Sequence, residues 1–155
     1  MNTIGVALLV EEHRGDIATA WRAAMGTEAE PALGFAIAPL LRELSLTLRD
    51  EGGTGRGAEA WGRIAVLVRS SARPAQLARE LKLLQRALWE ALASSGQPVS
   101  AAERIAVDGW LFDLLAECLE RLERLQSRLA ALDRPSDART PARVQPPPLP
   151  RSPHV

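Results

Sequence analysis

The sequence predicts an all-α protein: a bundle of about five helices that ends in a long C-terminal helix and a disordered proline-rich tail. Three observations predict this fold class. Apolar residues recur every three or four positions over most of 1–133, and no alternating run of strand length appears. Prolines and glycines separate the periodic stretches. Seven of the 11 prolines lie after Leu132, in a segment without apolar periodicity. We therefore expect one helical domain over 1–133 and an extended or disordered tail over 134–155.

Four helices are expected before the last one, over 3–25, 35–50, 57–70 and 74–94. The first carries His13 on an apolar stripe, and Gly26 is typical of a helix C-terminus. The fourth begins at Pro74, whose missing N–H costs no hydrogen bond in a first turn. Trp89 lies off the apolar stripe of that helix, so it is either a core anchor or a contact for a partner.

The last helix, 100–133, is indicated most strongly. Ser100 and Glu103 form a capping box, in which each side chain accepts a hydrogen bond from the backbone N–H of the other residue. Apolar residues then alternate steps of four and three, the 3.5-residue period of a coiled-coil seam. A helix of this length measures about 50 Å, which a bundle of this size does not cover. We therefore expect a partner to bind a seam formed by Leu115, Cys118, Leu122, Leu125, Leu129 and Leu132.

Charge and composition exclude several classes of protein. Nineteen basic residues balance 19 acidic ones, which argues against a general binder of nucleic acid or of membrane surfaces. The tail carries four arginines and one aspartate, so a net charge of +3 on the tail offsets −3 on the body. The single cysteine excludes a disulfide framework and a multi-cysteine zinc site. The apolar run Ile4–Val10 is too short to span a bilayer, and no basic region precedes it. We expect a cytoplasmic protein without membrane insertion.

Residues suited to catalysis are scarce. We find no set of nucleophile, base and acid and no metal-ligand spacing, so the sequence predicts a non-enzymatic protein without a cofactor or a metal. His13 is expected to be a hydrogen-bonded bundle histidine, and Cys118 a small buried apolar residue rather than a redox switch. A second hypothesis is a small-ligand pocket inside the bundle, near His13, Trp21 and Trp61.

Three segments carry a resemblance to a known family. The first is Leu8–Ile17 followed by Trp21; the second runs from Trp61–Arg63 to Leu77–Arg86; the third is the helix from Ser100 onward. Over Ile17 to Leu125 the chain resembles the N-terminal domain of RsbRD-type RsbT co-antagonist proteins, a domain that also precedes sensor histidine kinases. The resemblance implies a sensory or interaction module of bacterial signalling.

The chain departs from that family at three points. Trp61 stands where the family usually has histidine, and Leu81 where tyrosine is common. Where the family continues into a STAS domain or a kinase core, this sequence has a proline-rich tail. We therefore expect a stand-alone regulatory module that acts through helix–helix contacts, with a signalling protein or a second copy (a homodimer) as its partner. The alternative is a sensor that binds a small ligand.

Overall fold

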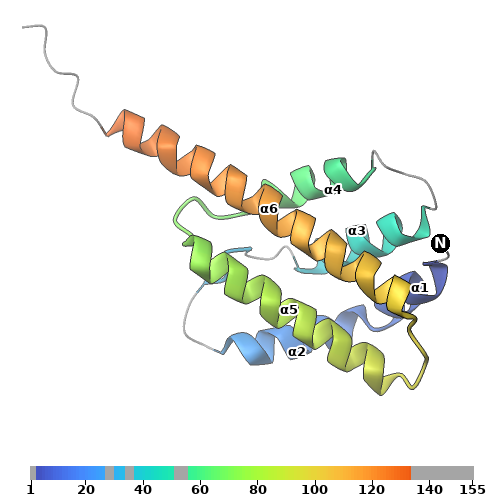
Figure 1. Ribbon diagram of the computed structural model, residues 1–155. Helices are drawn as coiled ribbons and strands as arrows, with labels where there is room; N and C mark the ends of the chain where they lie inside the picture. Colours follow the sequence, from blue (N-terminus) through green and yellow to red (C-terminus); the bar gives the residue numbers. More distant parts are fainter. Residues whose placement is uncertain (1–2, 27–29, 34–36, 51–55, 134–155) are drawn as a thin grey trace, which may run out of the picture.

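A computed structural model describes residues 3–26, 30–33, 37–50 and 56–133; the tail predicted over 134–155 lies outside the described residues. Within that part, the chain forms six helices and no strand (Figure 1). The predicted all-α class and the long C-terminal helix are confirmed. The helices are α1 (Ile4–Glu12), α2 (Arg14–Met25), α3 (Ile37–Arg49), α4 (Arg56–Ala65), α5 (Pro74–Ser94) and α6 (Ala101–Leu132).

Most of the helix contacts join helices that are not consecutive in the sequence. Helix α1 lies against α3, α2 against α5, and α6 against both α4 and α5. Figure 1 shows α6 crossing the whole bundle, with its C-terminal end extending past the other helices. The end of α6 is therefore the part of the structure with the least cover from its own chain.

The predicted helix over 3–25 is two helices, which break at His13. The two halves have different partners, because α1 packs on α3 whereas α2 packs on α5. Two side-chain hydrogen bonds fix the first pair: the Thr3 hydroxyl donates to the Leu48 carbonyl, and Ser45 Oγ donates to the Ala7 carbonyl at 2.9 Å. A bend between α1 and α2 lets each half bury its own apolar side chains.

The predicted helix over 57–70 ends earlier, at Ala65. Beyond it, Leu67 and Val68 donate backbone hydrogen bonds to residues three positions back, which tightens the chain into turns. The Arg69 N–H then donates to the Ala32 carbonyl at 3.0 Å. These turns place Val68 in the core and join the connection before α5 to the segment 30–33.

The predicted starts of the last two helices are confirmed. Helix α5 begins at Pro74, and α6 begins with the predicted capping box of Ser100 and Glu103. The Glu103 carboxylate also accepts the Val6 N–H at 3.2 Å, so it joins the start of α6 to the start of α1. No helix in the described ranges has the length and apolar character needed to cross a membrane.

Candidate interaction surface on helix α6

The seam predicted on the last helix is divided by the bundle. Cys118 and Leu122 are fully buried by the chain itself, and Leu115 and Leu125 are half-buried. Leu129 and Leu132, which are 47% and 80% exposed, lie on the end that extends past the bundle. Of the predicted seam, therefore, the last two leucines are the residues most available to a partner.

Burial also decides the chemistry of Cys118. Burial, and then the charge of Glu117, raises the pKa of the thiol to about 12, although Arg121 acts in the opposite direction. A thiol with that pKa carries almost no thiolate near neutral pH and is therefore a poor nucleophile.

A second exposed surface lies nearer the start of α6. Ile105 and Phe112 are 72% and 69% exposed, and their separation of seven residues places them on one helix face. Gly109 lies between them, and a Cβ added there would meet nothing within 4 Å. The spacing of Ile105 and Phe112 is visible in the sequence, but the predicted interaction surface rested on the longer leucine seam and left this face out.

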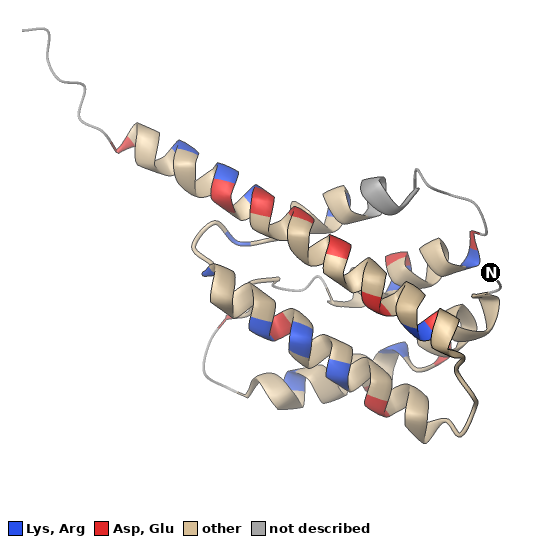
Figure 2. Cartoon of the chain, viewed as in Figure 1, with Lys and Arg blue, Asp and Glu red and all other residues tan. Residues whose placement is uncertain are grey.

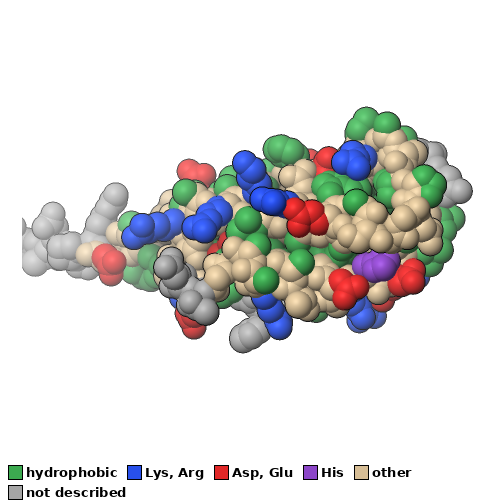
Figure 3. Space-filling model, turned by 90° about the horizontal axis from the view of Figure 1, so that it is seen from below, with side chains coloured by type: hydrophobic (Ala, Val, Ile, Leu, Met, Phe, Trp, Pro, Cys, Tyr) green, Lys and Arg blue, Asp and Glu red, His purple; other side chains and the backbone are tan. Residues whose placement is uncertain are grey.

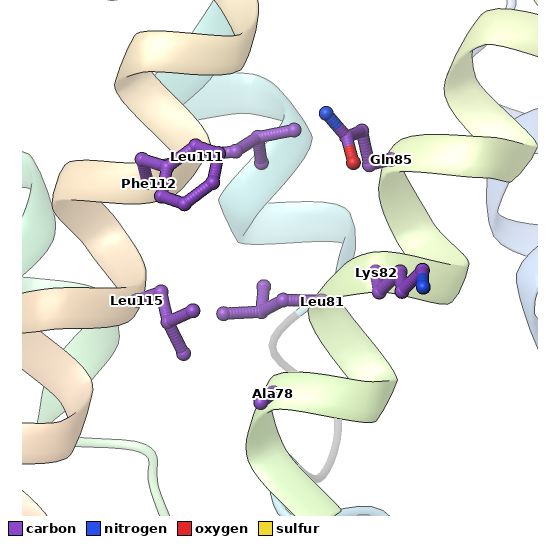
Figure 4. Close-up of a pocket in the computed structure, with 7 residues that line it drawn as sticks. All are labelled: Ala78, Leu81, Lys82, Gln85, Leu111, Phe112 and Leu115. Atoms are coloured by element: carbon purple, nitrogen blue, oxygen red, sulfur yellow. The ribbon is translucent and has the colours of Figure 1, made fainter. Parts of the chain in front are cut away.

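Phe112 borders a groove between α5 and α6 (Figure 4). Leu81 of α5 and Leu115 of α6 point toward each other across it, with Lys82 and Gln85 on the α5 side. The groove has a volume of about 290 Å³, enough for one or two large side chains. Its lining consists of Ala78, Leu81, Lys82, Gln85, Leu111, Phe112 and Leu115.

A polar cluster fixes the two helices beside this groove. Asp108 Oδ1 of α6 accepts hydrogen bonds from Gln85 Nε2 at 2.8 Å and from Trp89 Nε1 at 2.9 Å, both on α5. The Arg104 guanidinium lies over the Trp89 ring, 4.5 Å from its centroid. Trp89 thus contacts α6 of its own chain, and the groove is held in shape before anything binds.

The three residues of the predicted ligand pocket are not brought together. Trp21 is buried and lines a pocket of about 800 Å³ with Leu33 and Ile37. Neither His13 nor Trp61 lines that pocket. The histidine side chain lies near the surface where α1 meets α2, with Nδ1 3.5 Å from Asp16 (Figure 3). Trp61 is half-buried on α4.

Glu80 is a buried acidic residue that the sequence pattern did not reveal. It lies on α5, 1% exposed, and its carboxylate accepts the backbone N–H groups of Ala32 at 2.7 Å and Leu33 at 3.3 Å. Gln76 Nε2 donates a third hydrogen bond at 3.0 Å. These contacts hold the segment 30–33, which borders the pocket that Trp21 lines. In the sequence, Glu80 occurs among other charged residues of an amphipathic helix, and no local pattern marks it as buried.

The described residues contain no group of three or more histidine, cysteine or acidic side chains able to hold a metal ion. Comparisons with protein families, curated proteins and solved structures find nothing that matches this chain.

Proposed function

We propose that this chain is a protein-interaction module that acts through helix–helix contacts along α6. One observation carries the proposal: α6 leaves large apolar side chains exposed along its length. They are Ile105 near its start, Phe112 beside the groove, and Leu129 and Leu132 on the extending end. Large apolar side chains gathered at the surface of a helix are typical of contacts with another protein. A second copy of the chain is the simplest cover for the extending end.

The non-enzymatic character and the regulatory role in a bacterial signalling pathway form the finer part of this proposal. They rest on the scarcity of catalytic residues in the sequence and on the resemblance to the RsbRD N-terminal domain. In such a role, the module would convey a signal by binding and releasing a partner helix.

Paired variants test the proposal. Phe112→Glu and the double change Leu129→Glu/Leu132→Glu alter exposed side chains, so both proteins should fold as the parent does. We expect each to lose protein partners that the immobilised full chain captures from its source cells, or to lose self-association in sedimentation velocity.

The matched control is Ala23→Glu/Ala24→Glu, which adds two carboxylates to an exposed part of α2. It should behave as the parent protein. If neither α6 variant changes capture or self-association, the proposal is wrong.

A small-ligand sensor is the second candidate, favoured by the pocket that Trp21 lines. Its volume is in the range of small-molecule sites, and its walls are mostly apolar, with Arg22 and Arg69 among them. Native mass spectrometry of protein purified from its source cells should show a bound small molecule. A spectrum with the bare chain alone would argue against this function.

A further inference from the structure

The groove between α5 and α6 is basic on its α5 side. Lys82 lines the groove itself, and Arg79 and Arg86 lie one helical turn before and after it on the exposed side of α5. Figure 2 shows basic positions along this side of α5. Among the described residues, Arg79 and Lys82 have no ion-pair partner, while Arg86 pairs with Glu90 at 2.7 Å. The acidic residue within this stretch, Glu80, is turned into the core and bound there.

The floor of the groove and its α6 side are apolar. Leu81, Leu111 and Leu115 form the floor, and Phe112 stands exposed on the α6 side. Asp108 of α6 already accepts hydrogen bonds from Gln85 and Trp89. A ligand of the groove must therefore place apolar side chains on the floor and negative charge on the α5 side.

We propose that the groove binds an amphipathic helix of a partner protein whose apolar stripe is flanked by aspartate and glutamate. This inference rests on the proposed function and names its partner class. Apolar side chains of the partner enter between Leu81 and Phe112, and its carboxylates pair with Arg79 and Lys82. Such a helix-in-groove contact recognises apolar residues spaced three and four positions apart, while the basic α5 side selects among helices of similar shape.

Charge does not favour the two occupants that this chain itself could supply. The extending end of α6 carries Arg124 and Arg128 against Glu123 and Asp133, so it offers no excess of negative charge to Arg79 and Lys82. The segment 134–155 has a net charge of +3 and would be repelled by these basic side chains.

Two synthetic helical peptides test the inference on the full chain. They share leucines at steps of three and four and differ only in their flanking residues, glutamate in one and lysine in the other. In a nuclear magnetic resonance titration, the glutamate peptide should shift the signals of Leu81, Phe112 and Leu115. It should bind at least about tenfold more tightly than the lysine peptide, with a preference that weakens as salt rises.

Charge reversal supplies the control. Arg79→Glu/Lys82→Glu should reverse the preference, whereas Arg42→Glu/Arg49→Glu, the same change in net charge on exposed positions of α3, should keep it. Equal binding of the two peptides, or shifts confined to other surfaces, would overturn the inference. It would also be overturned if the parent chain self-associates and Phe112→Glu abolishes that association, because a second copy would then occupy the groove.

The outcome for the proposed function is separate. If the glutamate peptide shows no preferred binding while the α6 variants still lose their captured partner, the inference of an acidic partner helix is wrong and the proposed function stands. If the α6 variants lose nothing, the proposed function fails whatever the peptides do.

Discussion

The indole Nε1–H of Trp21 donates a hydrogen bond to the backbone carbonyl of Glu80 at 3.0 Å, which joins α2 to α5 inside the core. The side chain of the same glutamate accepts two backbone N–H groups from the segment 30–33. Glu80 of α5 thus binds both helix α2 and the segment 30–33.

Replacing Glu80 should therefore destabilise the protein strongly. Glu80→Ala leaves the buried N–H groups of Ala32 and Leu33 without an acceptor, and each such loss costs about 1–3 kcal/mol. We expect the free energy of unfolding in urea to fall by about 3 kcal/mol. Glu80→Gln keeps an acceptor oxygen and should cost less, so equal losses for the two variants would contradict this account.

The capping carboxylate of α6 predicts a dependence of stability on pH. Hydrogen bonds from the Ser100 backbone and hydroxyl, with a smaller contribution from the Val6 N–H, lower the pKa of Glu103 below its usual value. The folded state therefore gains stability from Glu103 above its unfolded pKa of about 4.3, and loses it as the pH falls through the lower folded value.

Glu103→Gln removes that titration. Between pH 7 and pH 3, the parent protein should lose more free energy of unfolding than the variant does. Parallel pH profiles for the two proteins would show that the contacts of Glu103 do not stabilise its charged form.

Cys118 should be unreactive in the folded protein. Because burial excludes solvent and raises the pKa of the thiol to about 12, a thiol reagent such as Ellman's reagent should react only when the chain unfolds. The reaction rate should rise to that of a free cysteine in denaturant. Rapid reaction at neutral pH in the native protein would place the thiol outside the core.

Gly109 predicts opposite effects on stability and on binding. No neighbour lies within 4 Å of a Cβ at this position, so Gly109→Ala should stabilise the protein by about 0.5–1 kcal/mol in thermal or urea unfolding. If a partner helix packs closely between Ile105 and Phe112, the added methyl group should also weaken that binding. A stabilised variant with unchanged binding would place the partner elsewhere on α6.

The sequence predicted the helices where local chemistry decides them. The capping box at Ser100 fixes the start of α6, and Pro74 fixes the start of α5. The break at His13 could not be read locally, because it follows from the different partners of α1 and α2. The burial of Glu80 escaped prediction for the same reason: the N–H groups that bind it come from residues almost 50 positions away.

The candidate surface was predicted in part. The 3.5-residue seam identified α6 as the helix with apolar side chains that the bundle does not cover, and Leu129 and Leu132 are exposed. Periodicity alone did not show which part of the seam the bundle covers, so Cys118 and Leu122 were assigned to a partner although the chain buries them itself. The groove beside Phe112 depends on how α5 and α6 pack, and that is a property of the tertiary structure.

Site-specific photo-crosslinking in the cells from which the chain comes tests the central claim most directly. A photoreactive amino acid replaces Phe112 or Leu129 on α6, or Ala24 on α2 as the control; all three positions are exposed. We predict protein adducts, to a second copy or to another protein, from positions 112 and 129 and none from position 24. The absence of adducts from both α6 positions, or equal adducts from all three, would contradict the claim that α6 carries the interaction surface.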